Sequence, residues 1–296
     1  MSDGLYWLAS YPKSGNTWVR AFIANLTHTG PGAVDINALD TGAIASSRHW
    51  IEATLGFDTT ELSHEEIDRL RPAVYRWCAH HSTAPAYHKI HDAYTCLPDG
   101  APLVPPEVTR GVLYLVRNPL DVAISFAHHA SCSIEQAITH MANPSSTFCG
   151  GHTRLYDQLR QRLLSWSAHV RSWADAPNLN RLIIRYEDMQ CHPCTTFHTI
   201  AAFLQLPTVP AQIAQALRHC DFTQLQQQEA EHGFEEKPAR AERFFRQGLV
   251  GEWQHRLSPT HIATIIDQHG DVMRRFGYLD DHGQPSTHFD QPEIWR

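Results

Sequence analysis

The chain opens on a short apolar run that passes through a tight polar turn straight into a helical pattern. The run is Leu5–Ala9, and the pattern Asn16–Leu26 places its apolar residues on one helical face. Three later runs are equally short and almost wholly apolar, which is typical of strands buried on both faces. These runs are Ala86–Ile90, Gly111–Val116 and Leu182–Tyr186. Such strands belong in a parallel sheet that helices cover on both sides.

Helical patterns lie between these runs and after the last of them. They are expected at Leu120–His129, Leu155–Trp173 and Phe197–Leu204, and from Ser258 to a stop at Gly277. The alternation predicts an α/β fold with an open, mostly parallel central sheet flanked by helices. Since the chain shows no internal repeats, residues 1–296 are expected to form a single domain, with a core of about 5–278 and a polar C-terminal tail, 279–296.

Charge and composition argue against several classes of protein. The formal net charge is -7, whereas a general nucleic-acid binder carries a basic excess, so no nucleic-acid partner is expected. The longest apolar runs fall far short of the ~20 residues that span a bilayer, and no membrane partner is expected either. The 21 histidines are scattered without the spacing of a metal site, so no metal is expected.

The cysteines favour a reducing compartment. They number seven, an odd count without the rhythm of a disulfide scaffold. Cys191 and Cys194 have the spacing of a redox motif, but their surroundings are not thioredoxin-like, so both are interpreted as ordinary thiols. The N-terminus shows no basic leader before an apolar stretch. A cytoplasmic location is therefore expected.

The turn after the first strand has the composition of an anion site. A strand that turns sharply into a helix directs backbone N–H groups and the positive end of the helix dipole at one place. Gly15 permits close backbone approach there, and Lys13 supplies a full positive charge. Ser14, Asn16 and Thr17 add hydrogen-bonding side chains. This P-loop-like strand–loop–helix predicts a phosphate site, with a surface turn and an incidental lysine as the alternative.

Two further elements carry an arginine at a suitable place. Arg117 ends a buried strand and Ser125 lies two turns into the helix that follows. The planar guanidinium suits phosphate oxygens, although an ion pair between Arg117 and Asp121 is an alternative. The other element is Arg246-Gln247-Gly248. Three anion-holding elements predict a ligand with phosphates at both ends.

Four stretches, in order, resemble the motifs of the cytosolic sulfotransferases that use 3′-phosphoadenosine 5′-phosphosulfate (PAPS). YPKSGNTW resembles the family's 5′-phosphosulfate loop, and LVRNPLDVAIS resembles its 3′-phosphate strand and helix. RLIIRYEDM resembles the strand with an adenine-contacting tyrosine, and RQGLVGEWQ resembles a degraded C-terminal phosphate loop. The resemblance covers residue 5 to about 255. It implies transfer of a sulfuryl group from PAPS to a hydroxyl or amine of a small-molecule acceptor, with PAP as product and no metal required.

The resemblance also implies roles for individual residues. The 5′-phosphosulfate would be held by Lys13, Ser14, Gly15, Asn16 and Thr17. The 3′-phosphate would be held by Arg117, Ser125, Arg246 and Gly248, with Gln247 between the last two. Adenine would be contacted by Trp18, Tyr186 and Phe222. Ordinary core packing is the alternative for Trp18 and Phe222.

AYHKIHDAY resembles the family's catalytic strand. Residues i and i+2 of a strand point to the same side, so Lys89 and His91 are expected to face the site together while His88 points away. The resemblance implies His91 as the general base, Lys89 at the sulfuryl oxygens and Lys13 at the leaving phosphate in an in-line transfer. A structural hydrogen bond is the alternative role for His91.

Departures from the family pattern leave other interpretations open. Gln247 and Gln254 stand where lysines are common, which would weaken cofactor binding. An ATP-dependent small-molecule kinase is one rival, although Gly-x-x-x-x-Gly-Lys-Ser/Thr is absent. A non-catalytic adenosine-bisphosphate-binding protein of the same fold is another. The poorly periodic stretches 28–85, 130–152 and 223–247 are expected to be acceptor-side loops. Aromatic residues in such loops favour a small phenol, alcohol or other metabolite as acceptor: Trp50, Phe57, Tyr75, Trp77 and Phe148.

Overall fold

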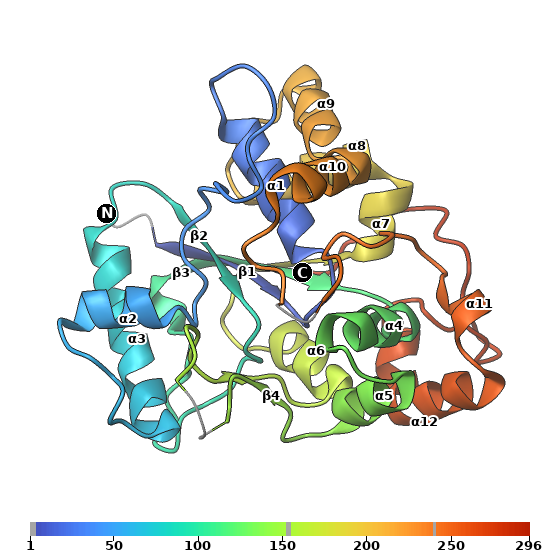
Figure 1. The fold of residues 1–296 in the computed structure, drawn as a ribbon, viewed down its shortest axis with the longest axis horizontal. Coiled ribbons are helices and arrows are strands. Elements are labelled where there is room, and N and C mark those ends of the chain that lie inside the picture. The colour runs from blue at the N-terminus through green and yellow to red at the C-terminus, as the bar shows by residue number, and fades with distance from the viewer. Residues whose placement is uncertain (1–3, 152–154, 239–240) are drawn as a thin grey trace.

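A four-stranded parallel sheet forms the centre of the computed structural model, which describes residues 4–151, 155–238 and 241–296. Its strands are β1 (Leu5–Ser10), β2 (Ala86–Ile90), β3 (Thr109–Val116) and β6 (Arg181–Arg185). Their order across the sheet is β2-β1-β3-β6, and each neighbouring pair is parallel. The expected α/β fold with an open parallel sheet flanked by helices is confirmed (Figure 1).

Alternate residues of each strand enter two separate hydrophobic cores. Trp7 and Tyr114 face one core, which is closed by α3 (His64–His81), α4 (Pro119–Ala130), α5 (Ile134–Ala142), α6 (Trp166–Ala174) and α12 (Pro259–Arg275). Leu8 and Leu115 face the other, which is closed by α1 (Asn16–Thr27), α8 (Pro193–Phe203) and α9 (Pro210–His219). Figure 1 shows these two helical layers on either side of the sheet. Burial on both faces explains why the strands are uniformly apolar.

Shorter elements complete the chain. They are α2 (Arg48–Leu55), the 3₁₀ turn η1 (Pro106–Val108), β4 (Thr147–Phe148), β5 (Gln161–Arg162), α7 (Tyr186–Cys191), α10 (Phe222–His232) and α11 (Trp253–Arg256). β4 and β5 form a small antiparallel pair. Among the described residues no helix has both the length and the apolar character needed to cross a bilayer. The cysteines, which all lie within those residues, are free.

The helix expected over Leu155–Trp173 is wrong in its first half. The observed helix α6 starts only at Trp166, where the Ser165 side chain caps it by accepting from the Ala168 N–H. Backbone groups of the preceding residues are bound elsewhere: the Leu159 N–H donates to the Ser46 carbonyl at 2.7 Å. These long-range bonds hold residues 158–162 extended, which the local apolar pattern could not reveal.

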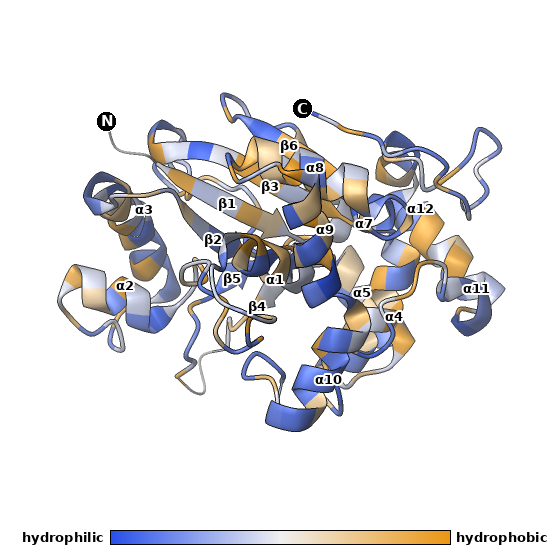
Figure 2. Cartoon of the chain, turned by 90° about the horizontal axis from the view of Figure 1, so that it is seen from above, coloured by the Kyte–Doolittle hydropathy of each residue, from blue (hydrophilic) through white to orange (hydrophobic). Residues whose placement is uncertain are grey.

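The stretches expected to be loops also contain helices. Residues 28–85 include α2 and α3, residues 130–151 include α5, and the third stretch includes most of α10. Figure 2 shows α10 as a largely hydrophilic helix, and only its Leu225 is buried. A helix with one buried residue has no apolar stripe to detect. Residues 152 and 239–240, which also belong to these stretches, lie outside the described part of the chain.

The C-terminal segment, residues 279–296, lies along the outer edge of the sheet. The Ile183 N–H of β6 donates to the Trp295 carbonyl at 2.9 Å, and Phe289 is buried. The Arg185 guanidinium contacts two aromatic rings of this segment, 4.9 Å from the centroid of Phe289 and 5.3 Å from that of Trp295. The polar composition of this segment gave no sign that Phe289 and Trp295 attach it to the sheet.

Candidate active site

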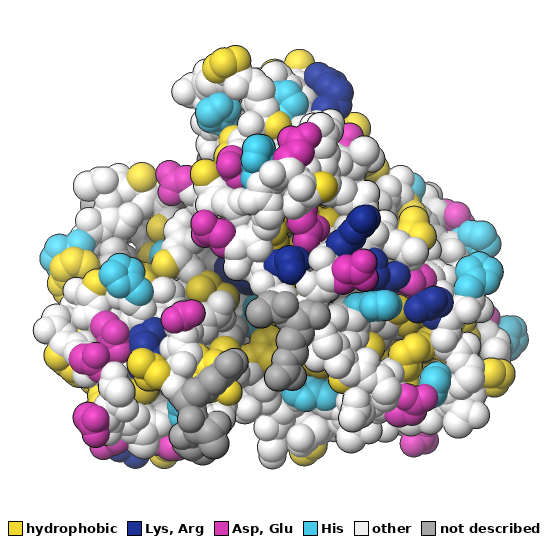
Figure 3. Space-filling view, in the orientation of Figure 1, with side chains coloured by type: hydrophobic (Ala, Val, Ile, Leu, Met, Phe, Trp, Pro, Cys, Tyr) yellow, Lys and Arg dark blue, Asp and Glu magenta, His cyan; other side chains and the backbone are white. Residues whose placement is uncertain are grey.

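The carboxyl ends of the central strands open into one cavity of about 970 Å³. It is lined by nearly every residue that the sequence assigned to the site: Lys13, Gly15, Asn16, Thr17, Trp18, Lys89, His91, Arg117, Ser125, Tyr186, Phe222, Arg246, Gln247 and Gly248. Ser14 is the exception, and it is buried within the same turn. Figure 3 shows Lys and Arg side chains grouped near the middle of one face, with acidic side chains among them.

The turn after β1 is held in an unusual conformation. Lys13 has a φ of 71° and Gly15 a φ of 95°, both in the left-handed region. A Cβ on Gly15 would lie 2.7 Å from Cδ2 of Tyr186, so only glycine fits against that ring. The Asn16 amide donates to the Leu8 carbonyl at 2.8 Å and ties the helix start back to β1. A left-handed lysine costs roughly 1–3 kcal/mol and persists because its surroundings hold it there.

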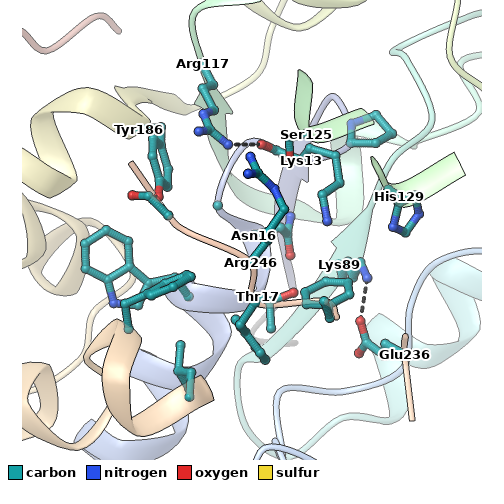
Figure 4. Close-up of a pocket in the computed structure, with 18 of the residues that line it drawn as sticks. Lys13, Asn16, Thr17, Lys89, Arg117, Ser125, His129, Tyr186, Glu236 and Arg246 are labelled. Carbon is teal, nitrogen blue, oxygen red and sulfur yellow. Dashed lines mark hydrogen bonds and ion pairs between the residues drawn. The ribbon is translucent and has the colours of Figure 1, made fainter. Parts of the chain in front are cut away.

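Arg117 provides much of that restraint. Its guanidinium donates to the carbonyl of Lys13 at 3.0 Å and to that of Leu249 at 3.0 Å, and it lies 4.3 Å from the centroid of the Tyr186 ring (Figure 4). The alternative ion pair with Asp121 does not form, because that carboxylate accepts from the backbone N–H groups of Gly251 (2.8 Å) and Trp253 (3.0 Å). The tips of β1 and β3 thus bring Lys13 and Arg117 together.

Positive charge accumulates at this end of the cavity without an equal countercharge. Burial, together with repulsion from Arg117, Lys89 and Arg246, lowers the pKa of Lys13 to about 7. The Lys13 ammonium sits 4.1 Å from the centroid of the Phe244 ring and has no carboxylate partner among the described residues. Arg246 is paired with Glu252. A buried lysine among other cations is the electrostatic signature of an anion site.

Two hydrogen-bonding atoms of the turn are also free to meet a ligand. The Ser14 hydroxyl and the Asn16 Oδ1 are buried and have no hydrogen-bond partner among the described residues. Buried polar atoms are nearly always paired in folded proteins. Together with the start of α1, these atoms make the turn suitable for a phosphate-like group.

Three aromatic side chains line one wall of the cavity. Trp18 contacts Tyr186 at a centroid distance of 6.2 Å in an edge-on arrangement. The Tyr186 hydroxyl donates to the carbonyl of Gly248 at 2.8 Å, and a Cβ on Gly248 would lie 2.6 Å from the Phe222 ring. Trp18 and Phe222 are only partly buried, and both face the cavity. Both also pack against the hydrophobic core that includes Phe197, so core packing and a place in the cavity wall are combined in these two residues.

Lys89 and His91 both line the cavity at the end of β2, as the alternation of a strand requires. His88 points away, stacked on Trp50 at a centroid distance of 4.5 Å. The Lys89 ammonium forms a 2.7 Å ion pair with Glu236 (Figure 4). The same carboxylate also binds Arg20. Lys89 is thus neutralised by a partner within the protein, unlike Lys13.

His91 is held from both its ring and its backbone. Its Nδ1 lies 2.9 Å from the Ser10 carbonyl, so this nitrogen carries the hydrogen and Nε2 is left with a lone pair. Its own carbonyl accepts from Nε2 of buried His169 at 3.0 Å, and the Tyr114 hydroxyl donates to the other nitrogen of His169. Burial, together with the nearby charge of Lys89, puts the pKa of His91 well below its usual value, so the ring is neutral.

Of the five aromatic residues that favoured a small acceptor, only one lines the cavity. Phe148 lines the cavity, but Tyr75 is in the core, and Phe57 and Trp77 are about half exposed on the surface. Trp50 packs on His88. Four of the five residues therefore add no support for a small acceptor, because aromatic content in a poorly periodic stretch does not show which way a ring points.

Sequence reasoning also missed residues that line the cavity. His129, Gln161, Glu236 and Phe244 belong to this set. His129 had a detectable signal, since it lies four residues after Ser125 and therefore on the same face of a helix. Glu236 and Phe244 lie in the stretch 223–247, which was expected to be an acceptor-side loop, but no pattern singled out either residue. Gln161 had no signal, because its segment was expected to be helical.

Known proteins resemble this chain in sequence and in fold. The sequence model of the sulfotransferase domain matches residues 3–277. Cytosolic sulfotransferase 1 of Arabidopsis thaliana is 25% identical over 272 residues, covering 88% of this chain and 77% of the relative. Flavonol 3-sulfotransferase of Flaveria bidentis is 24% identical, covering 87% and 78%. The crystal structure of mouse sulfotransferase SULT7A1 complexed with PAP superposes with a TM-score of 0.61 at 19% identity, covering 96% of this chain and 87% of that one.

Proposed function

The chain belongs to the sulfotransferase family, and from this premise we propose that it transfers the sulfuryl group of PAPS to a hydroxyl or amine of a small-molecule acceptor. One observation carries the proposal: Lys13 and Arg117, at the tips of neighbouring strands, lie together in one cavity with more positive than negative charge around them. A doubly phosphorylated adenosine carries the charge that such a site lacks.

The residues at the nucleotide end fit PAPS. The turn from Lys13 to Thr17 offers a lysine, a helix start and the unpaired Ser14 hydroxyl to the 5′ end. Arg117, Ser125 and Gly248 line the same cavity for the 3′-phosphate, and the aromatic wall of Trp18, Tyr186 and Phe222 suits adenine. Arg246 contributes less than a free arginine because Glu252 neutralises it.

The chemistry at the transfer point follows from the charges and hydrogen bonds of the side chains. PAPS supplies an activated sulfuryl group. Lys13 stabilises the negative charge that builds on the leaving phosphate, and Lys89 meets the sulfuryl oxygens. His91 takes the proton of the acceptor on Nε2, since Nδ1 is committed to Ser10. Asp92, a conceivable substitute base, is buried in an ion pair with Arg71 at 2.6 Å.

Binding of PAP to the purified protein tests the proposal. Saturating PAP, without added metal, should raise the melting temperature, because a ligand that binds only the folded state stabilises it. AMP should raise it less, and incubation with PAPS and a panel of small hydroxyl and amine acceptors should give a product heavier by one sulfuryl group in mass spectrometry. Phosphorylated product from ATP and Mg²⁺ would favour the kinase instead, and an unchanged melting curve with PAP would contradict both the enzyme and a non-catalytic PAP binder.

The protein is also proposed to act in the cytoplasm. Its free cysteines support this proposal, as does its similarity to cytosolic sulfotransferase 1 of Arabidopsis thaliana. Fractionation of cells that express the tagged full chain would test it.

A further inference from the structure

Two segments, one containing Ile44 and the other β5, line the cavity beside His91. The backbone N–H of Ala45 donates to the Lys89 carbonyl at 2.8 Å, which places Ile44 next to the end of β2. The N–H of Ala93 donates to the Arg162 carbonyl at 2.7 Å, which places β5 next to the residues that follow His91. Side chains of these walls therefore surround the place where an acceptor must meet the base.

Gln161 of β5 brings an unsatisfied amide into this wall. The side chain is 1% exposed, and its Nε2 donates to Oε1 of Gln158 at 2.9 Å. Its Oε1 has no hydrogen-bond partner among the described residues, yet Gln161 lines the cavity. Turning the amide over would exchange the two atoms and still leave one of them open. A buried amide of this kind points to a polar ligand group.

His129 faces the same cavity from α4, beside Phe148, which pairs with Gln161 between β4 and β5. It lies one helical turn beyond Ser125, between the aromatic rings of Phe148 and Phe244 at centroid distances of 6.3 and 6.2 Å. Neither ring nitrogen has a hydrogen-bond partner among the described residues. Burial and the nearby charges of Lys13 and Lys89 lower its pKa to about 3, so the ring is neutral and presents one donor and one acceptor.

We propose that the acceptor is a vicinal diol, whose second hydroxyl binds Gln161 and His129 while the first is sulfated. This inference rests on the proposed sulfotransferase function and deepens it. A hydroxyl both donates and accepts, so it satisfies the open amide oxygen and the imidazole at once. An acceptor with a single hydroxyl would engage His91 and leave both groups desolvated. A cationic amine is disfavoured, because Lys13 and Lys89 lie close to His129.

The step is balanced without a further reagent. The bond between sulfur and the bridging phosphate oxygen breaks, and a bond forms between sulfur and one hydroxyl oxygen of the diol. The proton of that hydroxyl goes to His91, and the electron pair of the broken bond leaves with PAP. The second hydroxyl keeps its proton and acts only in binding.

A matched pair of acceptors tests the inference with the full-length enzyme and PAPS. Catechol carries two adjacent hydroxyls, and 2-methoxyphenol has similar size but lacks the second donor. We expect kcat/KM for catechol to exceed that for 2-methoxyphenol by about ten- to a hundredfold, since a buried polar site rejects an analogue that leaves it unpaired. Gln161→Leu and His129→Phe should each bring the ratio toward one.

Controls separate this effect from loss of folding or of nucleotide binding. Both variants should keep the wild-type dissociation constant for PAP, and His128→Phe, at the exposed neighbour outside the cavity, should keep the wild-type ratio. Equal kcat/KM for the two acceptors, a ratio unchanged in both variants, or turnover of neither acceptor by a protein that binds PAP would overturn the inference alone. Failure to bind PAP would overturn the proposed function and this inference with it.

Discussion

The two ends of the cavity hold their charges differently. At the nucleotide end, Lys13 has no carboxylate partner among the described residues, and Arg117 bonds to backbone carbonyls. At the acceptor end, Lys89 is paired with Glu236, and the other hydrogen-bonding groups are the neutral side chains of Gln161 and His129. One end is built to attract an anion, and the other to orient a neutral molecule.

The two ends also differ in how they are assembled. Five consecutive residues and one helix start form the centre of the nucleotide end, and Arg117 and Gly248 join it from later segments of the chain. The acceptor end draws on segments around residues 44, 129, 161 and 236, which only the folded chain brings together. A motif of consecutive residues can be recognised in a sequence, whereas a cavity wall made of distant segments cannot. The following substitutions test whether the two ends act as separately as this difference implies.

The largest effect is expected at the acceptor end, from His91→Ala. Turnover should fall about 10²–10⁴-fold, the usual contribution of a positioned general base. The affinity for PAP, measured by calorimetry, should stay near the wild-type value, because the ring bonds to Ser10 and belongs to the acceptor end. Wild-type turnover in the variant would show that another residue is the general base, and His129 would be the next candidate.

Arg117→Ala should affect the nucleotide end selectively. Loss of a charge-assisted contact to the 3′-phosphate should weaken PAP binding roughly 10–100-fold. AMP lacks that phosphate and should lose much less. The ratio of the two dissociation constants matters here, because removing the bond from Arg117 to the Lys13 carbonyl disturbs the turn for both ligands. Equal losses would contradict the assignment of Arg117 to the 3′-phosphate.

The pH dependence of PAP binding tests the role of Lys13, which has no carboxylate partner among the described residues, unlike Lys89. Lys13 has a pKa of about 7 in the free protein, and a bound anion must raise it. Binding is therefore tightest while Lys13 is already protonated, below pH 7, and should weaken above it by up to about tenfold per pH unit. Titration calorimetry between pH 7 and 9 measures the slope. Lys13→Met should bind more weakly with a flat profile, and a flat profile in the wild type would contradict the role of Lys13.

Glu236→Gln should give the smallest effect, on stability. The ion pairs with Lys89 and Arg20 lower the pKa of Glu236 from 4.5 to about 2. A depressed carboxyl pKa stabilises the fold above pH 4.5, and that contribution is lost as pH falls from 4.5 through 2. Because the side chain is 31% exposed, screening limits the contribution to about 1–2 kcal/mol at neutral pH.

Urea unfolding at pH 7 and pH 3 measures this difference. The variant should be less stable than the wild type at pH 7, with a smaller gap at pH 3. Glu61→Gln, at an exposed glutamate, provides the matched control. A variant as stable as the wild type at pH 7 would show that Glu236 contributes nothing to the fold.

Much of the fold was predictable because its signals are local. All four central strands were confirmed within about two residues of their predicted bounds, since burial on both faces makes each a continuous apolar run. The helix starts after Gly15 and Asn118 were equally readable. Helix α10 and the first half of the segment 155–173 were not, because a hydrophilic helix has no apolar stripe and long-range backbone bonds override a local pattern.

The sequence by itself determined the strand–turn–helix at residues 13–17 and the arginine at the tip of the third central strand, because both depend on neighbours along the chain. Only the tertiary structure decided that Glu236 neutralises Lys89, that Arg246 is paired with Glu252, and that Gln161 and His129 share one wall. The reason is physical: charge compensation and desolvation depend on distances through space, which a linear pattern does not contain.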